Sequence, residues 1–198
     1  EVFTIDGVDQ ATGGGRYALT PVEFPAVLSA SPFADPNFRF NQQPHINFDE
    51  LEDLSGTEAA ERVRLAADWS PRLRDLGGIA VPRDTDSLIA MSAYAALRDA
   101  ADAVPEMTGK PLAQIVPATG FGVWMNPVLI TGDISERMAS NAFYAPGFDS
   151  FGLVKSSALE ALPIAALPAV WTHEFGHHLF YASFSRADGE CDASVAGG

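Results

Sequence analysis

The stretch WTHEFGHHLFY, residues 171–181, lies near the C-terminal end of this 198-residue chain and holds three of its four histidines. It contains the pattern H-E-x-x-H at His173, Glu174 and His177. A helix turns by about 100° per residue, so the two histidines lie on one face, one turn apart, and can reach one metal ion together. Glu174 is offset around the helix, where its carboxylate can contact a water on the metal without being a ligand. The pattern therefore predicts a zinc site with Glu174 as general base.

The residues around this pattern predict a helix that is buried on nearly all sides. Pro168 suits a first helical turn, and no proline follows it in the chain. The apolar residues of this segment fall on both sides of the predicted helix: Val170, Trp171, Phe175, Leu179, Phe180, Tyr181, Ala182 and Phe184. Buried histidines beside a buried glutamate need a partner, and a metal is the simplest one. The alternative is a surface helix that is rich in histidine.

Composition limits the classes of partner. The net charge is −14, and only 12 Lys and Arg are spread along the chain, which argues against nucleic acid and anionic membrane surfaces as partners. The longest apolar run, residues 161–171, contains Pro163 and Pro168 and is too short to cross a bilayer. A hydrophobic content of 47% is enough for a proper core. We expect a globular protein without membrane insertion.

The compartment is predicted from the start of the sequence. The chain begins at Glu1 without a methionine or a signal peptide, as a processed product does. The single Cys191 excludes an internal disulfide framework and does not decide the compartment. The expected location is secreted or in the cell envelope.

The first half of the chain is predicted to be rich in strands and loops. The runs 2–5 and 16–19 flank three glycines, which suggests a hairpin. The acidic run Asp49–Asp53 precedes a capping box at Ser55 that opens a helix to about Trp69. This run is either the solvated start of that helix, which we favour, or a calcium site. His45, isolated from other ligand types, is interpreted as a structural histidine.

The second half is predicted to be a helix, a small sheet and the H-E-x-x-H helix. The helix is expected from an N-cap at Asp86 to Pro105, with apolar residues at helical spacing. The sheet is expected from five short runs bounded by Pro, Gly and Asn: 115–116, 122–125, 128–131, 142–144 and 151–154. The fold class is therefore α+β, with residues 1–85 as a strand- and loop-rich region containing one helix, and 86–198 as the lobe that carries the motif. The sheet would form one wall of a cleft and the motif helix its floor.

Residues 86–182 resemble the N-terminal lobe of the thermolysin-like zinc metallopeptidases, the gluzincins. The likeness rests on the helix, the sheet, the stretch Asn141-Ala142-Phe143-Tyr144 and the motif HEFGH. It implies a zincin-like lobe in which a small, twisted, mostly antiparallel sheet packs on helices that include a buried H-E-x-x-H helix. It also implies a helical C-terminal lobe, which we expect beyond residue 198.

The resemblance assigns a substrate-binding role to the N-A-F-Y segment. In that family this segment is an edge strand that pairs with an extended peptide substrate. Asn141 would bind the substrate through its side chain, and Ala142 through its main chain, by strand addition. The alternative is an ordinary buried strand whose Phe143 and Tyr144 belong to the core.

The chain departs from the family pattern in its metal ligands. Family members often carry a calcium-binding aspartate four residues before the first histidine, where this chain has Ala169, so calcium is unsupported. The family's third zinc ligand is a glutamate that follows the motif at a distance. Here it is either an unusual ligand, Glu190 or less readily Asp188 or Asp192, or a glutamate beyond residue 198, which we favour. A metzincin pattern fails, because its remaining glycine and histidine would fall at Phe180 and Ser183.

The expected function is that of a secreted protease, a zinc-dependent metalloendopeptidase. His173 and His177 hold zinc with a carboxylate, and Glu174 takes a proton from a metal-activated water that attacks the peptide carbonyl. The alternative is a non-catalytic peptide-binding module, zinc-stabilised or metal-free, or an inactive fragment of a peptidase. A serine hydrolase is poorly supported, because no G-x-S-x-G occurs.

Overall fold

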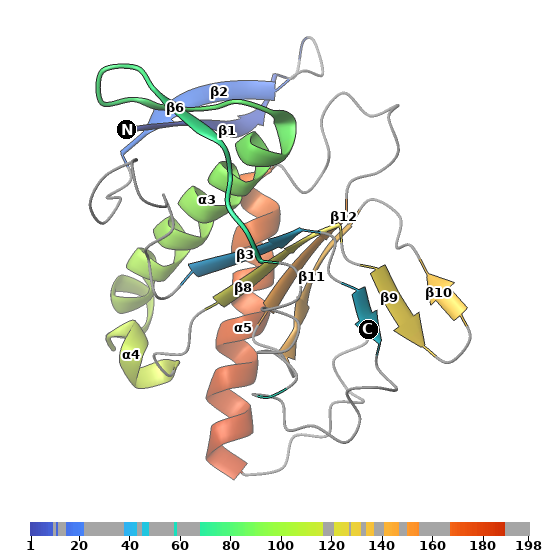
Figure 1. Ribbon diagram of the computed structural model, residues 1–198. Helices are drawn as coiled ribbons and strands as arrows, with labels where there is room; N and C mark the ends of the chain where they lie inside the picture. Colours follow the sequence, from blue (N-terminus) through green and yellow to red (C-terminus); the bar gives the residue numbers. More distant parts are fainter. Residues whose placement is uncertain are drawn as a thin grey trace.

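The protein is an α+β fold, as predicted. The computed structural model in Figure 1 describes residues 1–9, 11, 15–21, 38–42, 45–47, 58, 68–116, 121–126, 128–131, 134–136, 141–146, 150–154 and 167–188. These residues form two long helices, α3 (Thr85–Thr108) and α5 (Pro168–Asp188), and three small sheets. Among them, no helix combines the length and apolar character that a membrane span needs.

The central sheet has five strands in the order β11-β12-β8-β3-β5. Their bounds are β11 (Asn141–Ala145), β12 (Ser150–Val154), β8 (Phe121–Met125), β3 (Phe38–Gln42) and β5 (Asp68–Trp69). The two outer pairings are antiparallel and the two inner ones, β12–β8 and β8–β3, are parallel. The sheet is thus mixed, whereas the resemblance implied a mostly antiparallel one. Parallel neighbours require a crossover, and apolar runs alone do not reveal strand direction.

The predicted hairpin is present in a second sheet. Strands β1 (Val2–Val8) and β2 (Gly15–Thr20) pair antiparallel from Val2↔Thr20 to Val8↔Gly15. This sheet continues through β7 (Ala80–Pro82) to β6 (Leu73–Asp75). A third sheet contains β10 (Ile134–Glu136), β9 (Val128–Thr131) and β4 (His45–Asn47).

Helix α3 begins earlier and ends later than the sequence predicted. Its N-cap is Asp84, whose carboxylate accepts from the Ser87 backbone N–H at 2.8 Å, so the prediction of Asp86 as N-cap is wrong. Pro105 lies inside the helix instead of ending it. A proline so near the end removes one hydrogen bond from the last turns, a cost that the packed helix tolerates. The helix ends at Gly109, which adopts the left-handed φ of 69° that glycine accepts readily.

Two further sequence predictions are wrong, and others lie outside the described residues. Ile115, predicted to form a short strand with Val116, is the last residue of a short helix, α4 (Leu112–Ile115). Asp68 and Trp69, predicted to end a helix, form β5 because they pair with β3. Glu58 is helical, as predicted, but most of that predicted helix and the whole acidic run 49–53 lie outside the described residues.

The core lies where α3 and α5 cover one face of the central sheet (Figure 1). Along β8 and β12, alternate residues point to this face. The core side chains are fully or almost fully buried: Ile89, Met91, Leu97, Val123, Met125, Phe151, Leu153, Trp171 and Phe175. Helix α5 packs against α3 on one flank and against β11 on another. This packing places the H-E-x-x-H helix beside the outer strand of the sheet.

The cap of α3 gives a prediction with a defined pH dependence. Partial burial disfavours the charged form of Asp84. The hydrogen bonds from Ser87 and the positive charge of Arg72 outweigh this effect, so the pKa of Asp84 is lowered. Nη2 of Arg72 lies 2.9 Å from the Asp84 carboxylate. We expect Asp84→Ala to reduce the free energy of unfolding by about 1–2 kcal/mol at pH 7. Because the pKa of Asp84 is lower in the folded than in the unfolded protein, its carboxylate stabilises the fold fully at pH values above the unfolded-state pKa of about 4. The difference in unfolding free energy between the parent protein and Asp84→Ala therefore shrinks as the pH falls through the folded-state pKa.

Urea unfolding of both proteins at pH 7 and at acid pH measures this difference. Asp86→Ala is the matched control, because it removes a carboxylate two residues further along the same turn and leaves the cap in place. A larger loss for Asp86→Ala than for Asp84→Ala would contradict the cap assignment.

Candidate metal centre

The ring nitrogens of the two motif histidines lie within hydrogen-bond distance of each other. His173 and His177 lie one turn apart on α5, and their Nε2 atoms are 3.1 Å apart. Two nitrogens bound to one zinc at about 2.05 Å with a tetrahedral angle lie about 3.3 Å apart. The spacing of the two rings therefore fits a shared zinc ion.

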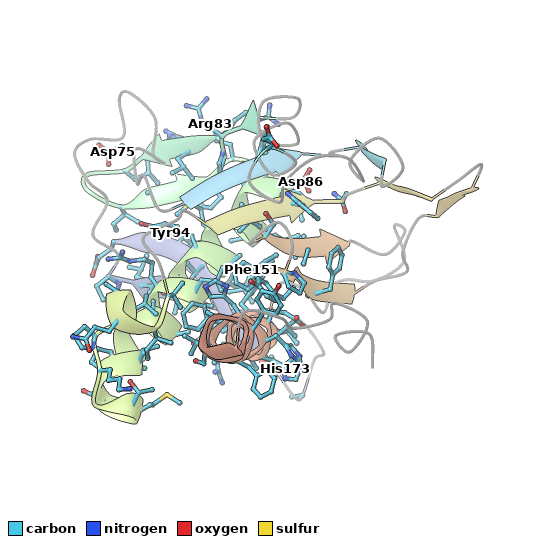
Figure 2. All side chains as sticks on the ribbon, turned by 90° about the horizontal axis from the view of Figure 1, so that it is seen from below. Asp75, Arg83, Asp86, Tyr94, Phe151 and His173 are labelled. Atoms are coloured by element: carbon cyan, nitrogen blue, oxygen red, sulfur yellow. The ribbon has the colours of Figure 1, made fainter. Side chains whose placement is uncertain are left out.

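Helix α5 is buried on one face only, so the prediction of burial on nearly all sides is wrong. The buried face carries Trp171, Glu174, Phe175, His178 and Ala182. The opposite face, with His173, Gly176, His177 and Phe180, is exposed. Figure 2 looks along α5, with Phe151 between this helix and the central sheet and His173 on another side of the helix. Helix α3 and β11 cover one face of α5, which leaves both histidine rings accessible to an ion and a substrate.

Glu174 lies at the border between these faces. Its side chain is almost buried, and the backbone N–H of Tyr144 in β11 donates to its carboxylate. Burial raises the pKa of Glu174 above its usual value, and this effect exceeds the lowering by the charges of His177 and His173 and by the Tyr144 hydrogen bond. A carboxylate with a raised pKa is a better proton acceptor near neutral pH than an ordinary one. This is the property that a general base needs.

His178 lies on the buried face of α5 and does not face solvent. It is 1% exposed, and its Nδ1 lies 2.9 Å from the Tyr144 hydroxyl. Its ring also packs on Phe151 and Phe175, at centroid distances of 5.9 and 5.8 Å. His178 follows Glu174 by four residues and lies on the same helical stripe as Trp171 and Phe175. Helical periodicity therefore predicts that its side chain is buried. The contact with Tyr144 joins residues 34 positions apart, and the sequence alone does not predict it.

The N-A-F-Y segment forms β11, the outermost strand of the central sheet among the described residues. It pairs antiparallel with β12, from Asn141↔Val154 to Ala145↔Ser150. Since the Tyr144 N–H points to Glu174, the main-chain groups of Ala142, two residues earlier, point to the same side. Phe143 and Tyr144 are half-buried, and the Asn141 side chain lies outside what the structure describes.

The third zinc ligand is not found among the described residues. Within them, no group of three His, Cys, Asp or Glu side chains is placed to hold a metal. Glu190 and Asp192 lie outside the described residues, and Asp188 is the last residue of α5, with an undescribed side chain. The described part of the site is therefore a pair of histidines with an adjacent carboxylate.

Comparison of the chain with protein-family models, curated proteins and solved structures finds no match. The likeness to thermolysin-like peptidases therefore remains an expectation from the quoted sequence motifs.

Proposed function

We propose that this chain is the zincin-like N-terminal lobe of a zinc-dependent metalloendopeptidase. The observation that carries the proposal is the pair of Nε2 atoms, 3.1 Å apart on the accessible face of α5, beside the nearly buried Glu174. A surface helix that is merely rich in histidine does not need a buried carboxylate at the border of the same site. The succession of α3, the mixed sheet with β11 at its edge, and α5 supports the zincin-like arrangement.

The residues of the chain have separate roles in the proposed hydrolysis. His173 and His177 would hold the zinc ion, which when bound supplies a water of lowered pKa and polarises the peptide carbonyl. Glu174 accepts a proton from the attacking water and delivers it to the leaving amine. The backbone hydrogen bond that Tyr144 donates to the Glu174 carboxylate favours its charged form, which is the form that accepts the proton.

The site needs one more ligand. Glu190, or less readily Asp188 or Asp192, would make this chain self-sufficient, whereas a glutamate beyond residue 198 would place the third ligand in a further lobe. We favour the second arrangement, because the family's glutamate follows the motif at a greater distance than Glu190 does.

The proposed substrate is an extended peptide that lies along β11. Asn141 and Ala142 would bind it, and main-chain hydrogen bonds would give affinity that depends little on the substrate sequence. The direct contact between β11 and Glu174 supports this placement, because a peptide on that strand lies next to the general base.

A non-catalytic peptide-binding module, zinc-stabilised or metal-free, is the second candidate. It is favoured by the described ligand set, in which only two histidines converge. A buried Glu174 beside the pair argues against it, because a purely structural site has no use for a base.

Zinc content tests the metal assignment. We expect a purified chain with a complete site to bind one zinc per chain by elemental analysis, and His177→Ala to reduce this to background because His173 and one carboxylate are too few ligands to hold the ion. His45→Ala is the matched control, since His45 is interpreted as structural, and it should leave the zinc content unchanged. Retention of full zinc by His177→Ala would refute the assignment.

The same measurement on Glu190→Ala locates the third ligand. A full equivalent in the parent chain that falls with this substitution makes Glu190 the ligand. Little zinc in both proteins is expected both for a ligand beyond residue 198 and for a metal-free module, and repeating the measurement with the following sequence included distinguishes the two.

A further inference from the structure

Tyr144 of β11 contacts α5 at two points. Its backbone N–H donates to the Glu174 carboxylate, and its hydroxyl is hydrogen-bonded to Nδ1 of His178 at 2.9 Å. The first contact involves the candidate general base. The second contact involves a histidine that the proposed chemistry does not use.

The two contacts match the geometry of the helix. Glu174 and His178 are four residues apart, so they lie on the same face of α5, about 6 Å apart along its axis. A tyrosine side chain spans this distance from its backbone to its hydroxyl. One residue of β11 therefore holds two successive turns of α5.

Packing restricts the strand on both faces. On the face toward α5, the Tyr144 ring packs on His178 and Phe151, at centroid distances of 5.1 and 5.3 Å. On the other face, the Phe143 ring fills the space where Gly152 of β12 has no side chain, and it meets Trp124 edge-on at 6.4 Å. With its two faces packed in this way, β11 has little freedom to move relative to Glu174.

We propose that Tyr144 and His178 are positioning residues that fix the general base. The hydrogen bond between the Tyr144 hydroxyl and His178 holds β11 against α5, and the Tyr144 N–H then holds the Glu174 carboxylate in the orientation that accepts the proton. This inference rests on the proposed function. The competing interpretation is a buried histidine that only stabilises the core, without effect on Glu174.

Three substitutions separate these interpretations. Tyr144→Phe removes the hydroxyl and keeps the ring, His178→Leu removes the imidazole, and His178→Asn keeps a polar atom near the position of Nδ1. Tyr181→Phe is the matched control, because it removes the hydroxyl of another tyrosine next to Tyr144. The ring centroid of Tyr181, on α5, lies 6.4 Å from that of Tyr144. The holoprotein, with whatever sequence completes its zinc site, is assayed on a fluorogenic peptide.

We expect Tyr144→Phe and His178→Leu to lower kcat by at least about 10-fold, since small displacements of a reacting group can cost up to about 100-fold. KM and zinc content should stay within about twofold, because neither side chain is among the proposed metal ligands or the proposed substrate-binding residues Asn141 and Ala142. His178→Asn should recover most of the loss, and Tyr181→Phe should match the parent. Hydrogen exchange of the residue-144 amide, followed by NMR, should accelerate in Tyr144→Phe and His178→Leu while core amides of α3 keep their rates.

An unchanged exchange rate of the residue-144 amide in both variants would overturn the proposal. Faster exchange of all core amides, without a selective effect at residue 144, would overturn it as well. The exchange measurement needs no turnover. If the parent protein shows no hydrolysis that depends on Glu174, the proposed function fails, whereas the amide still decides whether Tyr144 and His178 hold β11 on α5.

Discussion

Glu174→Gln is expected to retain zinc and to lower peptide hydrolysis by about 10²–10⁴-fold, the range that a positioned general base contributes. Glutamine has nearly the same shape, and its side-chain oxygen can still accept the hydrogen bond from the Tyr144 N–H. The amide cannot take a proton from water, so only the proton transfer is lost. Zinc content and the rate of hydrolysis of a labelled protein substrate, measured on the same preparation, separate the two effects.

Glu106→Gln is the matched control for this substitution. Glu106 is exposed on α3, so the same change of chemistry there should leave both zinc and turnover unchanged. A Glu174→Gln protein with a near-normal rate would remove Glu174 as the base. A parent protein that binds zinc and peptide without hydrolysing the peptide would favour the binding module instead.

The sequence predicts α5 and its histidine pair correctly because both depend on local geometry. The spacing of His173 and His177 determines their common face in any helix, whatever surrounds it. The solvent exposure of each residue on the helix does not follow from local geometry in the same way. Trp171 and Phe180 are both large and apolar, yet the first is 0% and the second 65% exposed, because α3 and β11 cover only one face of α5.

The contacts between β11 and α5 join residues far apart in the chain. Tyr144 and His178 are separated by 34 positions, and their approach depends on the antiparallel pairing of β11 with β12 and on the packing of α5. Strand order and direction in the central sheet are likewise set by tertiary pairing, which short apolar runs do not encode. Only the resemblance to a family predicts the N-A-F-Y segment as an edge strand, and β11 does lie at the edge of the described sheet.

Trp171→Ala is expected to lower the free energy of unfolding by about 3–5 kcal/mol, the usual cost of truncating a buried aromatic residue. Trp171 is fully buried on the face of α5 that packs into the core, one turn before Phe175. Its removal leaves a cavity at the start of the helix that carries the site. Since domains of this size are typically stable by about 5–15 kcal/mol, this single change would remove a large fraction of the total. Denaturant unfolding followed by circular dichroism measures the loss.

Phe180→Ala is the matched control, because it removes a large apolar side chain from the exposed face of the same helix. Its effect should remain within about 0.5 kcal/mol, as for most surface substitutions. The comparison also bears on the metal centre, since His173, His177 and Phe180 share that face. A loss for Phe180→Ala as large as that for Trp171→Ala would mean that the face is covered in the folded protein, and the two histidines would then not be accessible to a substrate. A small loss agrees with an open face on which a zinc ion and a peptide can meet Glu174.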